Sequence, residues 1–426
     1  MKIKLFILSF VVSLMSFAQQ RTCGMQEQMD KVMFNPVLKK QYEERQAKFE
    51  VEYQKLLEKQ ASSNRLLSPN ATIIIPVAIH FPSVSNATAE ATKVLYRNFA
   101  QSQIDVINAD YNAANSDLSN WSAASAFYPG VNIGDLDVQF VVATQNHPAG
   151  TGLVNGVKAV TFGTDFLSGA DSDATWSGYM NFVIRDLGAG LLGYSPLGGS
   201  PGTGQTVVMN TWCYGTGSGV PGTPYVPAAP FNLGRTVTHE LGHFFNLDHT
   251  FASTGCNPAG ASCTTEGDRV CDTPRLTTET YNCPANGSVN ACGTLKSLTM
   301  NYMDYVDDAC MYMFTAGQAT RSVAYINTIS SQFKPNVLGD TSFLASNFSF
   351  YPNPSKGTFN IQFKEVVSDF NVEIFDVTGK VVYINAFYQN SDLVKEIKIQ
   401  DEISKGIYFM NIKTNEGLIT KKIIIE

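Results

Sequence analysis

The pattern of apolar positions divides the chain into a mixed helix-and-strand part and a smaller part made of strands. Residues 72–81 form a short apolar run that is typical of a buried strand. Between residues 93 and 112 apolar side chains recur at helical spacing, at Ala100, Ile104, Ile107 and Tyr111. Further apolar stretches predict strands at 138–143 and 180–185 and a helix from 315 to about 332.

The last eighty or so residues have a different pattern, in which apolar and polar side chains alternate. Alternation over short segments that are separated by turns predicts antiparallel strands. These segments are 358–363, 372–376, 404–410 and 421–426, with a turn at 377–380. The pattern predicts a small antiparallel β-sandwich over residues 345–426.

The N-terminus combines three segments of different character. Lys2 and Lys4 precede an apolar stretch, and small residues at positions 16 and 18 predict a signal peptide over residues 1–18. The apolar stretch is too short to span a membrane, and no later stretch is longer, so the mature protein is expected to have no membrane span. Residues 39–60 are rich in Lys, Glu and Gln and predict an exposed helix within a propeptide over residues 19–66.

Three of the five histidines fall within residues 239–249. On a helix, His239 and His243 share one face and can hold one metal ion. Glu240 projects toward the same place and can take a proton from a metal-bound water. If the chain turns back near Asn246, His249 becomes a third ligand and leaves the fourth position to water, as in catalytic zinc sites. The alternative is an amphipathic helix with surface histidines.

A second group of residues follows the histidines in Asn301-Tyr302-Met303-Asp304-Tyr305. Metzincin peptidases place a methionine in a tight turn beneath the zinc, and Met303 fits that position. Tyr305 would stand beside the metal, where its hydroxyl could stabilise an oxyanion. The alternative is that both side chains belong to the core.

These segments resemble the pappalysin family of metzincins, peptidase family M43, from about residue 70 to about 335. The resemblance rests on residues 234–251, 267–274 and 301–310. It implies an α+β fold, with a metzincin catalytic domain at 67–338 whose Gly-rich stretch 195–219 borders the substrate cleft. The family has Gly where this chain has Asn246, the next most tolerant residue for a left-handed turn. The segment from Tyr351-Pro352-Asn353-Pro354 onward resembles the sorting domain of the type IX secretion system; the alternative is a spacer or carbohydrate-binding sandwich.

The resemblance also implies individual roles. It implies two disulfides, Cys256–Cys292 and Cys283–Cys310, which leaves Cys263–Cys271 as a local bridge. It implies a structural calcium site in which Asp268 and Thr273 match the ligand positions, with the Asp272 carboxylate and the Cys271 carbonyl as secondary candidates; the alternative is a plain turn. Cys23 is a candidate zymogen switch whose thiolate would cap the zinc; the alternative is a spare thiol. Cys213 has no evident partner.

The resemblance to metzincins also implies that the chain just after the methionine turn lines the pocket for the residue after the scissile bond. A carboxylate there would favour Arg or Lys, and Asp308 is the preferred candidate over Asp307. The alternative is that both carboxylates face solvent or bind an ion.

Composition narrows the function further. The net charge of −7 and the absence of a basic patch argue against a nucleic-acid partner. Eight cysteines fit an oxidising compartment. The sequence therefore predicts a secreted zinc endopeptidase made as a zymogen, which acts on proteins or peptides and is exported by the type IX machinery. The alternative is a non-catalytic surface adhesin on the same scaffold.

Overall fold

A computed structural model describes the chain as two units, residues 1–337 and 338–426, which are considered separately below. The residues described are 20–63, 73–163, 166, 171–256, 262–338, 348–363, 367–399, 403–414 and 417–426. The expected signal peptide, residues 1–18, and its cleavage site lie outside these ranges.

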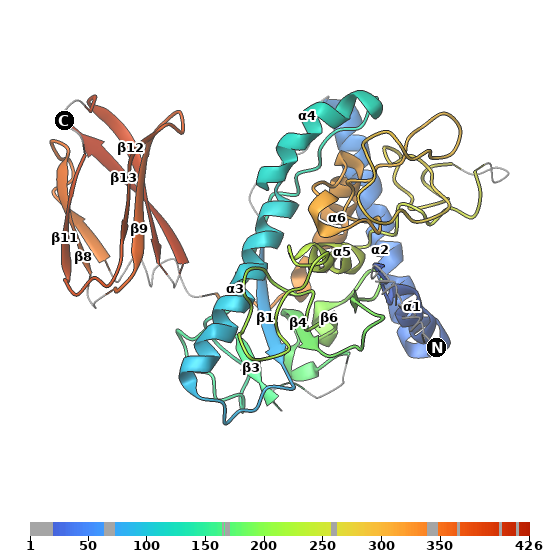
Figure 1. Cartoon of the computed structure of the whole chain (residues 1–426), viewed down its shortest axis with the longest axis horizontal. Helices are drawn as coiled ribbons and strands as arrows, with labels where there is room; N and C mark the ends of the chain where they lie inside the picture. Colours follow the sequence, from blue (N-terminus) through green and yellow to red (C-terminus); the bar gives the residue numbers. More distant parts are fainter. Residues whose placement is uncertain are drawn as a thin grey trace, which may run out of the picture. The chain divides into compact units, whose positions relative to one another are not determined.

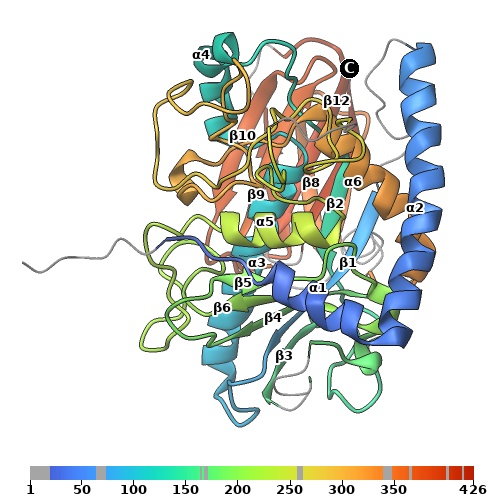
Figure 2. The same cartoon turned by 90° about the vertical axis from the view of Figure 1, so that its right-hand side faces the viewer.

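A mixed β-sheet forms the centre of the first unit (Figures 1 and 2). The strand order is β2-β1-β4-β6-β5, and β3 also pairs with β1. All pairings are parallel except that of β5 with β6, which is antiparallel. The strands are β1 (Ile73–Phe81), β2 (Val138–Val142), β3 (Val160–Phe162), β4 (Met180–Arg185), β5 (Gly193–Tyr194) and β6 (Thr206–Asn210).

The sheet explains the continuous apolar runs in the sequence. The last seven residues of β1 are all buried, as are five of the six in β4. Parallel strands that are covered on both faces have no solvent-exposed face, so apolar and polar residues do not alternate along their sequences. The short edge strand β5 ends the sheet beside the helix that carries the histidine motif, which it contacts.

Helices pack against the sheet and against one another. Helix α3 contacts both β2 and α5, while α5 contacts β5 and β6. Helices α2 and α6 run side by side (Figures 1 and 2). The α-helices are α1 (Met25–Phe34), α2 (Pro36–Ser63), α3 (Glu90–Tyr111), α4 (Trp121–Ala124), α5 (Arg235–Phe244) and α6 (Ala316–Ile329). Short 3₁₀ helices are η1 (Ser116–Asn120), η2 (Ser125–Phe127), η4 (Ala174–Trp176), η5 (Pro201–Thr203), η6 (Asp308–Cys310) and η7 (Ser330–Gln332).

The segment between α5 and α6 has little regular structure. Among its described residues the only helix is η6, and no strand is present. Three disulfides tie it together: Cys256–Cys292, Cys263–Cys271 and Cys283–Cys310. These are the three expected pairs. Covalent links of this kind compensate for the small apolar core of such a segment.

The second unit consists of two antiparallel sheets, ordered β10-β9-β12-β13 and β11-β8-β7. Apolar side chains from both sheets form one core, which includes Phe359, Ile374, Met410 and Ile423. The strands are β7 (Phe348–Tyr351), β8 (Thr358–Phe363), β9 (Phe370–Asp376), β10 (Val381–Phe387), β11 (Val394–Lys398), β12 (Gly406–Thr414) and β13 (Gly417–Ile425). The expected β-sandwich is present.

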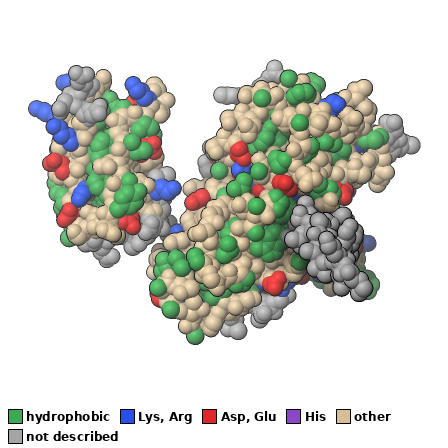
Figure 3. All heavy atoms as spheres, viewed as in Figure 1, with side chains coloured by type: hydrophobic (Ala, Val, Ile, Leu, Met, Phe, Trp, Pro, Cys, Tyr) green, Lys and Arg blue, Asp and Glu red, His purple; other side chains and the backbone are tan. Residues whose placement is uncertain are grey.

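Two surface properties bear on function. Within the described residues, no helix has both the length and the apolar character that a membrane crossing requires. On the face in Figure 3, Lys and Arg side chains are scattered over the first unit, and no histidine is seen there.

Candidate metal centre

Helix α5 carries the histidine motif through the interior of the first unit. All ten of its residues are buried. Phe245 follows the helix, and Asn246 then adopts a left-handed backbone with φ 71°. That conformation is open mainly to Gly and Asn, and it turns the chain back so that His249 faces the helix. Asn246 thus makes the turn expected of it.

The three histidines converge on one point. The Nε2 atom of His243 lies 3.2 Å from that of His239 and 3.1 Å from that of His249. His239 Nδ1 donates to the carbonyl of Tyr302 at 2.6 Å, and His243 Nδ1 donates to the carbonyl of Leu247 at 2.7 Å. These bonds place the proton on Nδ1 and leave the Nε2 lone pairs facing one another.

This arrangement fits a zinc ion. Tetrahedral zinc with nitrogens at 2.0–2.1 Å requires neighbouring nitrogens about 3.3 Å apart. Burial lowers the pKa of His239, of His249 and of His243, the last to about 4, so all three rings are neutral. Neutral lone pairs at such distances repel each other unless a cation lies between them.

Glu240 lies directly beside this point. Its Oε2 accepts from the Cys23 thiol at 3.2 Å, while the buried Oε1 has no hydrogen-bond partner. Burial raises the pKa of the carboxyl to about 8, although the Cys23 bond and the Arg21 charge lower it. Ser195 Oγ donates to the Glu240 carbonyl at 2.6 Å and fixes the backbone.

Cys23 completes the group from the N-terminal segment. One ligand atom from each of Cys23, His239, His243 and His249 lies within 4.8 Å of the others, and this is the one such His/Cys/Asp/Glu group among the described residues. Desolvation and the Glu240 charge raise the pKa of the thiol in the absence of a metal. The backbone of Thr22–Gly24 pairs with the free edge of β5, through Leu192 and Gly193.

Arg21, two residues before Cys23, fills an acidic pocket. Its Nη2 lies 2.6 Å from Asp308 Oδ1, its Nε donates to the Val306 carbonyl at 3.1 Å, and its Nη1 donates to Thr236 Oγ1 at 3.0 Å. The guanidinium lies 4.9 Å from the centre of the Phe231 ring. Arg21 and Asp308 are both buried. No feature of the sequence predicts this role for Arg21.

Asp308 is held in place from behind. Its Oδ2 accepts from the backbone N–H groups of Leu233 at 2.8 Å and Arg235 at 3.3 Å, so the carboxylate is fixed at the start of α5. Asp307 is only partly buried and makes no ion pair with Arg21.

Met303 and Tyr305 lie where the motif places them. A Cβ atom at Gly242 would come within 2.5 Å of Met303 Sδ, so the sulfur packs directly against α5 between two of the histidines. The Tyr305 ring centre lies 5.7 Å from that of His239 and 5.1 Å from that of His249. Burial raises the pKa of Tyr305, so its hydroxyl stays protonated and can donate.

The expected calcium residues are only partly brought together. Asp268 is buried; its Oδ1 accepts from Thr273 Oγ1 and Val270 N, while its Oδ2 has no partner. Asp272 differs from the expectation, because both of its oxygens bind the start of α6, at Thr315 Oγ1 and Gly317 N. Its carboxylate therefore caps the start of α6.

The remaining Cys and His residues have structural roles. Cys213 is a buried free thiol that donates to the Leu192 carbonyl. His80 is buried between Thr161 and Asn181, which both hydrogen-bond its ring. His147 binds the Val157 carbonyl.

A polar network behind the metal centre could not be predicted from the motif. Arg235 Nη1 donates to the Tyr302 hydroxyl at 2.6 Å and lies 2.9 Å from Asp110 Oδ1. Asp110 also accepts from Thr238 at 2.6 Å. The network joins α3, α5 and the methionine turn, and so holds the Tyr302 carbonyl that orients His239.

Comparison with known proteins agrees with this geometry. Residues 173–327 match the family described as pregnancy-associated plasma protein-A, and residues 349–426 match the secretion system C-terminal sorting domain. An extracellular metalloprotease of Verticillium alfalfae is 30% identical over 261 residues, which are 61% of this chain and 79% of that protein.

Other relatives match over less of their length. Extracellular metalloprotease 1 of Coccidioides posadasii is 37% identical over 140 residues, 33% of this chain and 46% of that protein. The chain thus spans about half the length of several relatives. The fold is similar to that of a promirolysin mutant from Tannerella forsythia, with a TM-score of 0.50 and 24% identity over 74% of this chain and all of that one.

Proposed function

The chain belongs to the M43 family of zinc metalloendopeptidases, and we propose that it is a secreted endopeptidase that is made as a latent precursor and prefers Arg or Lys directly after the scissile bond. The observation that carries the proposal is the meeting of three histidine Nε2 atoms beside a buried carboxylate with one unpaired oxygen.

The proposed chemistry assigns a task to each of these side chains. His239, His243 and His249 would hold the zinc, which when bound polarises a carbonyl and lowers the pKa of its water toward neutrality. Glu240 accepts the water proton on its free carboxylate oxygen and passes it to the leaving amine. Tyr305 donates its hydroxyl hydrogen bond to the oxygen that becomes negative in the transition state.

The proposed latency follows from the position of the N-terminal segment, which lies at the candidate zinc site and along the edge of β5. Cys23 places a thiol in the fourth ligand position, where a substrate or water would otherwise lie. The same segment covers the edge of β5, so no extended substrate can pair there at the same time. These contacts support residues 19–66 as a propeptide, with residues 67–338 as the catalytic domain.

Arg21 supports the preference for basic residues. A guanidinium already occupies the pocket of Asp308, with one charge-assisted bond, two further hydrogen bonds and an aromatic face. An Arg side chain of a substrate would make the same contacts once the propeptide leaves, because the pocket is built by the catalytic domain alone. A Lys could reach Asp308 as a point charge.

We also propose a structural calcium ion at Asp268. A buried carboxylate oxygen without a partner is costly, and a hard cation would satisfy it. Thr273 and neighbouring backbone carbonyls would supply further oxygens.

The second unit determines where the protein acts. It is a secretion sorting domain, so the protein reaches the cell surface or the extracellular space. We propose that its binding partner is the type IX secretion machinery.

The peptidase assignment is tested with propeptide-free protein. We expect one zinc per chain and hydrolysis of a denatured protein, both abolished by a chelator. Glu240→Gln should retain the zinc and the fold but lose nearly all turnover, because the ligands remain and the proton acceptor does not. If the wild-type protein holds zinc and cleaves nothing, the non-catalytic adhesin takes the place of this proposal.

A further inference from the structure

We propose that the propeptide binds the catalytic domain through a second contact surface, which contains none of the proposed metal ligands and keeps the propeptide bound after the chain is cut. This inference rests on the proposed latency and adds a separate anchor to it. The α2 contact surface consists of Gln46, Phe49 and Tyr53 of α2 with Asn246, Arg321 and Tyr325 of the catalytic domain.

A reciprocal pair of amides forms the polar part of this surface. Gln46 Nε2 donates to Asn246 Oδ1 at 3.2 Å, and Asn246 Nδ2 donates to Gln46 Oε1 at 3.1 Å. Asn246 is only 1% exposed, so water does not compete for these bonds. If α2 left, both amides would have to find new partners. The side chain of the turn residue therefore recognises the propeptide, in addition to permitting the turn.

Cation–π contacts between Arg321 and two aromatic rings form the second part of the α2 contact surface. The Arg321 guanidinium lies 4.8 Å from the Phe49 ring centre and 5.6 Å from that of Tyr53. Phe49 is fully buried and also lies 5.8 Å from the Tyr325 ring. Arg321 Nε donates to the Asn246 carbonyl at 2.9 Å, which joins the two parts of the surface. Buried aromatic and Arg side chains of this kind dominate binding energy at interfaces.

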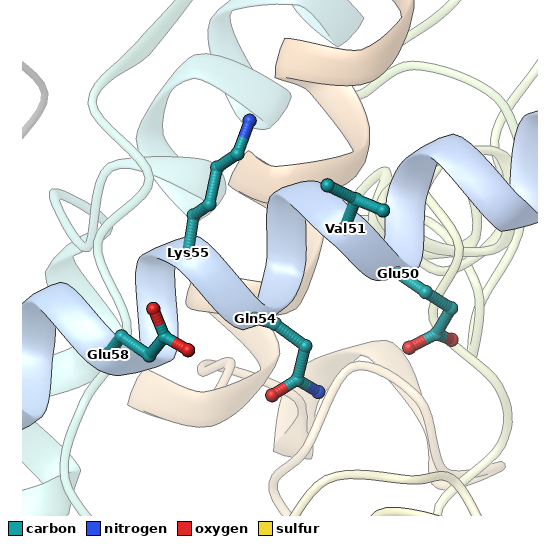
Figure 4. Close-up of a pocket in the computed structure, with 5 residues that line it drawn as sticks. All are labelled: Glu50, Val51, Gln54, Lys55 and Glu58. Atoms are coloured by element: carbon teal, nitrogen blue, oxygen red, sulfur yellow. The ribbon is translucent and has the colours of Figure 1, made fainter.

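The contact continues along α2. Arg45 Nη2 reaches the Gly198 carbonyl at 3.4 Å, and Gln60 Nε2 donates to Thr320 Oγ1 at 2.7 Å. The helix expected to be exposed is therefore exposed on one face only. That outer face carries Glu50, Val51, Gln54, Lys55 and Glu58, drawn in Figure 4.

The position of this surface separates two steps of activation. Loss of the Cys23 contact would free the fourth ligand position, yet none of the bonds of α2 depends on Cys23. A cut between α2 and β1 would break the chain but not the interface. Full activation then requires α2 to dissociate or to be degraded, and dissociation slows as the two pieces bind more tightly.

The experiment uses the full chain with Glu240→Gln, so that retention does not depend on turnover. A recognition sequence for an unrelated site-specific protease is placed between residues 63 and 73, and the chain is cut. Size-exclusion chromatography measures how much propeptide stays bound, and the dissociation rate is followed with the catalytic part immobilised. We expect the wild-type propeptide to co-elute with the catalytic domain.

Matched variants separate the two anchors. Gln46→Ala should speed dissociation about 10-fold and Phe49→Ala about 100-fold or more. Gln54→Ala removes the same kind of side chain from the outer face and should change nothing. Asn246→Gly keeps the left-handed turn and should act like Gln46→Ala. Arg21→Ala combined with Cys23→Ser should leave most of the propeptide bound.

The proposal is overturned if the wild-type propeptide leaves on cutting, or if Gln46→Ala and Phe49→Ala dissociate no faster than Gln54→Ala. Because Phe49 belongs to the propeptide, Phe49→Ala leaves the sequence of the catalytic domain unchanged. An unchanged melting temperature of the isolated catalytic domain confirms that this domain is correctly folded. The zinc content and turnover of the propeptide-free enzyme test the proposed function separately, so the two failures are distinguishable.

Discussion

Replacing Asp308 by Asn should remove most of the proposed preference for Arg after the scissile bond. The substitution keeps the shape and leaves an amide oxygen to accept from the Leu233 and Arg235 N–H groups. It removes the charge that faces the guanidinium and turns an N–H₂ group toward it. Arg21 and Asp308 are both buried and lie 2.6 Å apart. A substrate Arg in Asp308→Asn would lose the free energy of one such charge-assisted contact.

The magnitude follows from that contact. A hydrogen bond to a charged group contributes about 1.5–3 kcal/mol, and each 1.4 kcal/mol changes a rate ratio tenfold. We therefore expect kcat/KM for an Arg peptide to fall by about 10- to 150-fold. A substrate Arg could still donate to the Val306 carbonyl and to Thr236 Oγ1, as Arg21 does, so recognition is weakened and not lost entirely.

Two peptides that differ only by Arg or citrulline after the scissile bond supply the assay. Citrulline keeps the shape of Arg without its charge, so propeptide-free Asp308→Asn should cleave the two at similar rates. The melting temperature and zinc content of the variant serve as controls for the fold. The reasoning is refuted if wild type cleaves both peptides equally, or if Asp308→Asn retains the wild-type ratio with its fold intact.

Three further outcomes are expected. Cys23→Ser in the precursor should raise basal activity, but only partly, because Arg21 and α2 stay in place; hydrolysis of a small peptide by uncut precursor measures this, and a precursor as inactive as wild type would remove Cys23 from its role. A calcium-selective chelator should lower the melting temperature and speed self-cleavage between residues 256 and 292, because a bound ion stabilises only the folded state; an unchanged melting temperature with zinc retained would eliminate the site at Asp268. Deletion of residues 345–426 should leave an active enzyme inside the cell envelope, as measured by cell fractionation, and normal export of the shortened chain would contradict the proposed sorting role.

Local features of the fold and site could be predicted from the sequence. His239, Glu240 and His243 lie on one helix, so their spacing alone fixes their common direction. His249 follows a turn whose residue type, Asn246, is among the few that permit it. Strand β4 was predicted with the residues that it has, because a buried strand is a continuous apolar run.

Features that depend on distant contacts could not be predicted. Arg21 and Asp308 are 287 residues apart in the sequence, and contacts such as the pairing of Thr22–Gly24 with β5 bring them together. Strands β10 and β11 were missed because most of their side chains are at least partly exposed, which leaves no clear alternation. The hydrogen bonds of Asp272 to the start of α6 could not be predicted, because Thr315 lies 43 residues away in the sequence.

The contacts of α2 also bear on how two side chains from a short segment, Arg21 and Cys23, would maintain the proposed latency. Arg21 and Cys23 belong to an extended segment that alone makes few contacts, and such a segment loses much conformational freedom on binding. Docking of α2 on α6 holds this segment close to its site, so its binding becomes intramolecular. A tether of this kind raises affinity by about 10²- to 10⁴-fold without any new contact at the metal. Latency on this view depends on α2 as much as on the thiol. A peptide of residues 20–24 should therefore inhibit the propeptide-free enzyme far more weakly than the intact propeptide does.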